Sequence, residues 1–81
     1  MSNSINISEI EQFVIDFVIK LRDKKDLTQG DIAAILNVER TFITNVESKK
    51  NRAKYNLNHI NKLADHFGMS PRDFLPEKSF T

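Results

Sequence analysis

Four polar side chains near the middle of the chain have types and spacing that suit contacts with the edges of nucleic-acid bases: Arg40, Thr41, Thr44 and Asn45. A guanidinium pairs with a guanine edge through two hydrogen bonds, an asparagine amide pairs with adenine in the same way, and a threonine offers a hydroxyl and a methyl group. On a helix these four positions share one face, away from the apolar Ile43 and Val46. We therefore predict a base-reading face. The plain alternative is the solvated side of an ordinary small helix.

A basic segment directly follows this face, and its cations are Lys49, Lys50, Arg52 and Lys54. Each phosphate that a cation neutralises releases counterions, so such a segment would add affinity that depends on salt and not on base sequence. The alternative is a loop that only keeps the protein in solution. Lys24 and Lys25 are weaker candidates for phosphate contacts. Phe42 is out of phase with the buried positions of its helix, so we expect it to cover a phosphate or a sugar, or to close the side of the core.

The net charge of +1 conceals an uneven distribution. Residues 1–19 carry three acids and no Lys or Arg, whereas residues 20–54 carry nine bases against five acids, a net of +4. A basic central segment next to an acidic N-terminal segment favours one positively charged face, which suits the binding of a polyanion. An evenly solvated surface is the competing interpretation.

The composition bounds the fold and the classes of function. A chain of 81 residues, 40% hydrophobic and 28% charged, predicts one globular domain with a small core. The absence of Cys excludes disulfides and thiolate metal sites. No apolar run reaches the length of a membrane span, and the N-terminus lacks the pattern of a signal peptide. We expect a soluble, cytoplasmic protein.

No catalytic or metal-binding constellation is recognisable in the sequence. The serines have no paired base at a recognisable spacing, and the two glycines form no phosphate-binding loop. His59 and His66 lie two helical turns apart, so one metal ion cannot easily take both. We therefore expect neither an enzyme, nor a metal site, nor a cofactor.

Apolar periodicity and capping residues predict an all-α domain over residues 8–76, between an N-terminal arm (1–7) and a short tail (77–81). Helices are expected from Ser8 to Lys24 or Lys25, from Thr28 to Leu36, over 40–48, over 57–67 after Asn56, and briefly after Ser70 and Pro71. Asn37 and Gly68 are the expected left-handed positions. The apolar stripe of the first helix is expected to comprise Ile10, Phe13, Val14, Phe17, Val18 and Leu21. Leu57 begins the stripe of the fourth helix, and Phe74 and Leu75 are expected to fold back on the core.

A set of short segments stands in a fixed order along the chain: Leu27-Thr28-Gln29, Ile32-Ala33, Leu36, Val38, Ile43, Val46-Glu47, Leu63-Ala64, Phe67-Gly68-Met69-Ser70 and Phe74-Leu75. In this pattern the chain resembles the Cro/C1-type (Xre) family of helix-turn-helix regulators. The segment from Glu39 to Thr44 also resembles the recognition helix of restriction–modification controller proteins, a subclass of that family.

This resemblance implies a five-helix, lambda-repressor-like domain whose second and third helices form the helix-turn-helix. It implies sequence-specific binding of double-stranded DNA by a transcriptional regulator, a repressor or autoregulator, with phosphate contacts from Thr28 and Gln29 and a structural role for Glu47. A homodimer on a palindromic operator is expected, since such operators are commonly two-fold symmetric. Its interface would use Phe74, Leu75 or Phe80, or the acidic N-terminal segment. The alternative function is that of an antitoxin-like module that neutralises a partner protein.

The chain departs from the family pattern in the region after the third helix. Lys49 stands where a Gly is usual, the following loop is about two residues longer than the family norm, and the usual Pro is missing. Either Lys49 is strained or the turn differs. Glu39 replaces the usual Ser, Thr or Asp, so we predict a weak cap on the base-reading helix.

Overall fold

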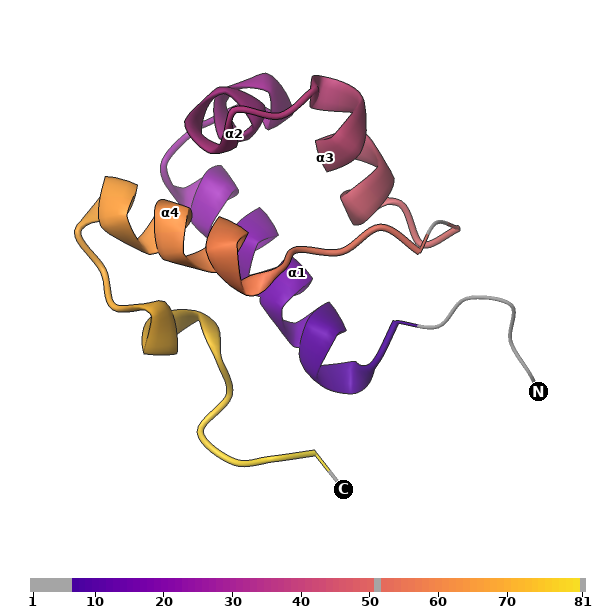
Figure 1. The fold of residues 1–81 in the computed structure, drawn as a ribbon, viewed down its shortest axis with the longest axis vertical. Helices are drawn as coiled ribbons and strands as arrows, with labels where there is room; N and C mark the ends of the chain where they lie inside the picture. Colours follow the sequence, from indigo (N-terminus) through magenta and orange to yellow (C-terminus); the bar gives the residue numbers. More distant parts are fainter. Residues whose placement is uncertain (1–6, 51, 81) are drawn as a thin grey trace.

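Four α-helices and one short 3₁₀ helix make up the part of the chain that the computed structural model describes, residues 7–50 and 52–80 (Figure 1). Their bounds are α1 Glu9–Lys24, α2 Gln29–Leu36, α3 Arg40–Glu47, α4 Leu57–Phe67 and η1 Pro71–Phe74. Within those residues there is no strand, so the predicted all-α class is confirmed. The fifth predicted helix is a single four-residue 3₁₀ turn. None of the described helices is long and apolar enough to cross a membrane.

Side-chain caps begin three of the four α-helices. The side chains of Ser8, Thr28 and Asn56 each accept a hydrogen bond from the backbone N–H of the third helical residue, and that residue's side chain accepts one from the cap N–H. These reciprocal bonds satisfy two otherwise unpaired donors at each helix start. Helix α3 is different, because Glu39 makes no side-chain capping bond. The predicted weak cap is therefore confirmed.

Left-handed residues end α2 and α4 as predicted. Asn37 has φ 58° and ψ 47°, and Gly68 has φ 66° and ψ 34°. Asn tolerates this region better than other non-glycine residues, and Gly enters it without a steric cost. Lys49 does not adopt a positive φ, so the chain leaves α3 by a different turn, with Ser48 extended. No strain is needed where the family's Gly is missing.

The helices pack around one core. Helix α2 contacts α3 and α4, α1 contacts α3 and η1, and α4 contacts η1. Figure 1 shows α2 and α3 joined by a tight turn at one end of the molecule, with α1 running diagonally away from them and α4 crossing it in this view. The buried hydrophobic residues are Val14, Ile15, Val18, Ile32, Ala33, Leu36, Ile43, Val46, Tyr55, Ile60, Leu63, Ala64 and Phe74.

The buried face of α1 is rotated from the predicted stripe. Ile10 and Phe13 are exposed, whereas Ile15, which lies outside that stripe, is buried. Helix α1 contacts both α3 and η1, and these two neighbours bury a different part of its surface from the one that periodicity alone indicates.

Three further residues differ in burial from the predicted pattern or were not included in it. Phe74 is buried as expected, but its neighbour Leu75 is exposed because the chain becomes extended there. Leu57 is also exposed, since it is the first residue of α4 and the inner face of that helix starts at Ile60. Tyr55, which the sequence analysis did not assign to the core, is buried in the segment that follows the basic loop.

Of the predicted N-terminal arm, residues 1–6 lie outside the described part of the chain. Ile7, its last residue, is partly buried and packs against the core. In the tail, the ring of Phe80 lies against that of Phe13, with 6.3 Å between the ring centroids. Both side chains stay partly exposed.

The hydroxyl of Tyr55 leads to a first prediction. It is buried and finds no hydrogen-bond partner among the described residues. A buried unpaired hydroxyl costs about 1–3 kcal/mol in desolvation. Tyr55→Phe keeps the ring and removes this cost, so the free energy of unfolding should stay equal or rise by up to about 1 kcal/mol in urea denaturation. A loss of more than about 1 kcal/mol would show that the hydroxyl makes a stabilising bond.

Candidate nucleic-acid interface

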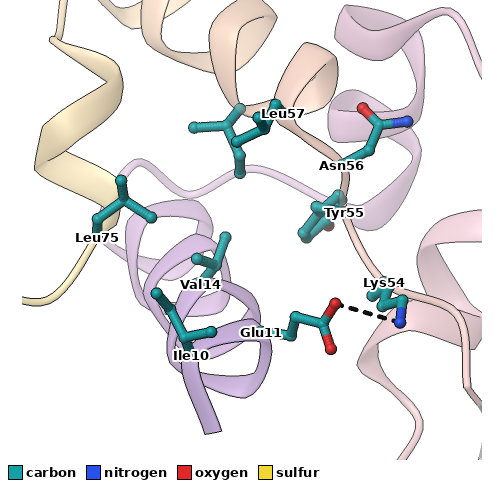
Figure 2. A pocket seen from close by; sticks show the side chains of 9 residues that line it. Ile10, Glu11, Val14, Lys54, Tyr55, Asn56, Leu57 and Leu75 are labelled. Carbon is teal, nitrogen blue, oxygen red and sulfur yellow. Dashed lines mark ion pairs between the residues drawn. The ribbon is translucent and has the colours of Figure 1, made fainter. Parts of the chain in front are cut away.

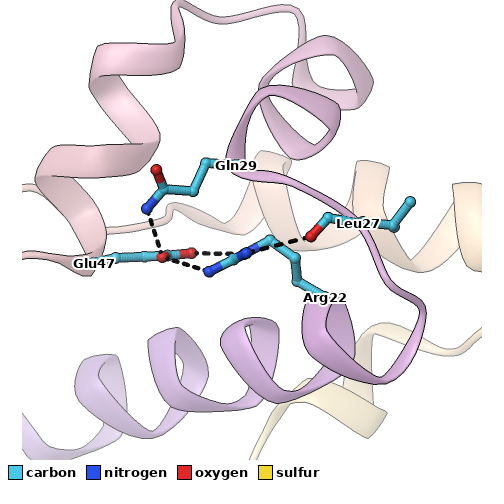
Figure 3. A network of polar contacts seen from close by, with 4 residues as sticks. All are labelled: Arg22, Leu27, Gln29 and Glu47. Carbon is cyan, nitrogen blue, oxygen red and sulfur yellow. Dashed lines mark hydrogen bonds and ion pairs between the residues drawn. The ribbon is translucent and has the colours of Figure 1, made fainter.

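An ion pair between α1 and α3 fixes the C-terminal end of α3. The guanidinium of Arg22 donates through Nη2 to Oε1 of Glu47 at 2.9 Å and through Nε to Oε2 at 3.2 Å. Its Nη1 donates to the backbone carbonyl of Leu27 at 3.3 Å. Figure 3 shows these contacts meeting between the helices. Both side chains are largely shielded from water, 17% exposed for Arg22 and 10% for Glu47, so solvent screens the pair only weakly.

Gln29 joins the same network from the start of α2. Its Nε2 donates to Oε1 of Glu47 at 2.9 Å, as Figure 3 shows. The resemblance implied a phosphate contact for Gln29, but in this structure its amide is directed inward to a carboxylate. The expected structural role of Glu47 matches what the structure shows, because this one carboxylate links residues of α1 and α2 to α3. Thr28 stays exposed at the N-terminus of α2, where its hydroxyl accepts from the N–H of Asp31 at 3.0 Å.

The polar face of α3 points into solvent. Arg40, Thr41 and Asn45 are exposed, while Ile43 and Val46 on the opposite side are buried. The structure therefore brings three of the four predicted base readers together on one accessible helix face. A Cβ built on Gly30 would lie 3.8 Å from Cδ of Arg40, so the stem of Arg40 runs over the start of α2.

Thr44 is less available than its neighbours on this face. It is half-buried, and its hydroxyl donates to the backbone carbonyl of Thr41 at 3.0 Å. Threonine hydroxyls in helices commonly bond back to the preceding turn in this way. Its hydroxyl hydrogen is thereby used within the helix, so what Thr44 offers a base is an acceptor oxygen and a methyl group, which can pack on a thymine methyl.

Phe42 packs into an aromatic cluster. Its ring centroid lies 6.2 Å from that of Tyr55 and 5.1 Å from that of His59, and Tyr55 meets His59 at 5.9 Å. Of the two alternatives for Phe42, the structure shows the one in which it closes the side of the core, and its ring is only partly accessible to a sugar or phosphate. The cluster ties α3 to the start of α4.

The cations after α3 separate into two groups. Lys49, Lys50 and Arg52 are exposed. Lys54 is exposed as well, but it forms an ion pair with Glu11 of α1, with Nζ 3.2 Å from Oε2. Its predicted phosphate contact is therefore not prepared in this structure, because the ammonium is already directed to a carboxylate. Lys25, a weaker candidate, lies over the ring of Phe67 at 5.3 Å.

Three residues that make these contacts were not identified from the sequence. Arg22 was counted only as one base of the basic middle, and Tyr55 and His59 were given no role in positioning α3. Helical spacing places Arg22 near the end of α1, but its partner comes from α3, far along the chain. No local signal connects the two. The Asn56–His59 spacing was a usable signal for His59, since that spacing matches a capping box.

No protein-family model, no curated protein and no solved structure matches this chain. What it binds is therefore inferred from its own residues and from the arrangement described above.

The ion pair of Glu47 generates a stability prediction. Glu47→Gln preserves size but leaves the shielded Arg22 guanidinium without an anionic partner, so the free energy of unfolding should fall by about 2–3 kcal/mol in urea denaturation. The matched control is Glu39→Gln, which changes an exposed glutamate without a capping bond and should shift stability by less than about 0.5 kcal/mol. Equal effects of the two substitutions would contradict the role assigned to the pair.

His59 generates a pH prediction. Its Nδ1 accepts the backbone N–H of Asn56 at 3.0 Å, which requires the neutral ring. Burial, and then the nearby charge of Lys62, lower the pKa of His59 in the folded protein. The unfolded chain therefore binds this proton more readily, so the stability due to neutral His59 is present above about pH 6.5 and is lost as pH falls through the lowered folded-state pKa.

The measurement is the change in unfolding free energy between neutral and mildly acidic buffer. His59→Gln, whose side chain keeps a capping acceptor and does not titrate, should lose less stability on acidification than the parent. His66→Gln is the matched control, because His66 is exposed near the other end of α4, and it should respond as the parent does. A parent-like response from His59→Gln would remove His59 as the source of the pH dependence.

Proposed function

We propose that this protein is a helix-turn-helix regulator of the Cro/C1 type that binds double-stranded DNA and reads its sequence with α3. The observation that carries the proposal is the exposed row of Arg40, Thr41 and Asn45 on a helix whose other side is anchored in the core. In this proposal α2 and α3, with the turn at Asn37, form the DNA-binding pair. The protein would act in transcription as a repressor or autoregulator.

The dimensions of α3 suit the major groove. With its side chains, an α-helix is about 10–12 Å in diameter. A B-DNA major groove is also about 12 Å wide and admits one α-helix. Arg40 at the N-terminal end is placed for a guanine edge and Asn45, one turn further on, for an adenine edge. The exposed hydroxyl of Thr41 lies between them in the sequence.

Phosphate contacts would surround this face on two sides. Lys49, Lys50 and Arg52 supply exposed charge after α3. The N-terminus of α2, beside Thr28, adds the positive end of a helix dipole that suits a phosphate, although the Asp31 carboxylate of its capping box lowers the positive charge there. Gln29 and Lys54 are left out of this set, because each is bound to a glutamate. A two-fold symmetric operator would be read by two copies of the chain, one on each half-site.

Arg40→Ala and Lys50→Ala test the two kinds of contact against each other. Binding sites are first selected from random duplexes, and each variant is then titrated on selected and on random DNA. Arg40→Ala should lose about 1–3 kcal/mol of affinity for the selected site and relax the choice of one base pair. Lys50→Ala should weaken both DNAs about equally and reduce the slope of log affinity against log salt by about one.

Two results would count against this assignment. If the parent protein enriches no sequence and binds no duplex at low salt, α3 does not read DNA. If Arg40→Ala weakens selected and random DNA equally, Arg40 contacts a phosphate and not a base. Far-ultraviolet circular dichroism of both variants establishes that the helices are intact, which is expected because both side chains are exposed.

A further inference from the structure

Helix α3 is the one α-helix among the described residues that begins without a side-chain cap. The other three follow Ser8, Thr28 and Asn56, whose short side chains each bond the first turn of the helix. Glu39 stands at the same position before α3 and makes no such bond. A good cap stabilises the start of a helix, so a long acidic side chain at this position departs from a local rule that the rest of the chain follows. Departures of this kind are expected at functional sites.

The carboxylate of Glu39 is also exposed and uncommitted. The glutamates that tie helices and loops together have cationic partners, since Arg22 holds Glu47 and Lys54 holds Glu11, as Figure 2 shows for the second pair. Glu39 takes part in no ion pair and no side-chain hydrogen bond within the part of the chain that the structure describes. Its side chain is therefore available to a ligand and does not serve the fold.

The sign of this charge is unexpected where it stands. From Ile32 to Asn56 the sequence has two acids against five bases, and one of the two acids is the shielded Glu47. Glu39 is thus the exposed acid of a segment whose other exposed charges are positive, and it directly precedes Arg40. A negative charge here weakens the attraction to any phosphate, so non-specific attraction to a polyanion does not account for it.

We propose that Glu39 is a specificity-determining residue that accepts a hydrogen bond from the amino group of a cytosine beside the base that Arg40 reads. This inference rests on the proposed function. Glu39 immediately precedes the first turn of α3, and the N-terminal residues of a recognition helix are those that contact base edges. A carboxylate only accepts hydrogen bonds, and cytosine presents an amino donor in the major groove. Adenine presents its amino group next to the acceptor N7, which repels a carboxylate.

The same charge penalises sites without this cytosine. Opposite the oxygen of a guanine or a thymine, the carboxylate of Glu39 meets another acceptor and loses its hydration without gaining a bond. A repulsive contact of this kind discriminates against all competing sequences at once. Glu39 therefore lowers the affinity for random DNA more than the affinity for the selected site. This gain in discrimination accounts for the absence of a capping residue from the start of α3.

Glu39→Gln tests the proposal, because it keeps the length of the side chain and removes its charge. Sites are selected from random duplexes, and each protein is titrated on the selected site, on the same site with the cytosine pair replaced, and on random DNA. Replacement of the cytosine should weaken binding of the parent roughly 5- to 150-fold. With Glu39→Gln, whose amide both donates and accepts, the loss should shrink to less than about threefold. This variant should also bind random DNA more tightly than the parent does.

The matched control is Glu77→Gln. It removes the same charge from an exposed position in the tail after η1, which Figure 1 shows at a distance from α3. This control should keep the base preference of the parent. Glu39→Ser adds a second readout, because serine supplies a cap. Its midpoint in urea denaturation should rise while its preference for cytosine is lost. A residue with only a structural role would not move stability and base choice in opposite directions.

A base analogue isolates the contact itself. Pyrimidin-2-one in place of the cytosine lacks the amino group that Glu39 is proposed to bind. The parent should bind the duplex with this analogue more weakly than the duplex with cytosine, whereas Glu39→Ala should bind the two duplexes alike. Any general effect of the analogue on the duplex is shared by both proteins and cancels in the comparison.

The outcomes separate this inference from the proposed function. If the parent enriches no sequence and binds no duplex at low salt, both fail together. If Arg40→Ala relaxes the choice of one base pair but Glu39→Gln keeps every base preference of the parent, the role of Glu39 alone is overturned. An equal gain by Glu39→Gln on selected and random DNA also overturns it, because Glu39 then acts only through its long-range charge.

Discussion

The arrangement of α1, α2 and α3 depends on one carboxylate. Glu47 accepts from Arg22 of α1 and from Gln29 of α2, and it is itself the last residue of α3. Three helices that are separate in the sequence are therefore linked at one largely shielded point. Helix α3 needs this link more than the others do, because it is only eight residues long and has no side-chain cap at its start. A helix of this length is not stable alone in water, so tertiary contacts must hold it.

The contacts of α3 leave one side free. Ile43 and Val46 are buried against the core, Phe42 packs on Tyr55 and His59, and Glu47 is held in the polar network. The positions that remain are Arg40, Thr41 and Asn45, and these are the residues whose chemistry suits base edges. The accessibility of that face is thus a consequence of how the other side chains are used. The orientation of the face should be well defined, because α3 is anchored along its length and not at one end only.

Local features of the fold were predictable from the sequence, and long-range ones were not. Capping residues and left-handed positions depend on neighbours within four residues, and so Ser8, Thr28, Asn37, Asn56 and Gly68 were read correctly. The buried side of α1 and the exposure of Leu57 depend on which helix lies against which, and periodicity carries no such information. The same holds for the site. The polar face of α3 was predicted because it is continuous in the sequence, whereas the partners of Gln29 and Lys54 come from other helices.

The pairing of Lys54 with Glu11 explains why one segment serves two surfaces. Lys54 pairs with Glu11 of α1, and the chain turns toward the core at the next residue. Tyr55 is then buried under Phe42, and α4 begins with Leu57 at the rim of an apolar groove between α1 and the segment after η1 (Figure 2). The residues before this pair belong to the loop that would contact phosphate. The residues after it line this apolar groove. Any change in the path of this segment therefore alters the positions of α3 and of the groove together.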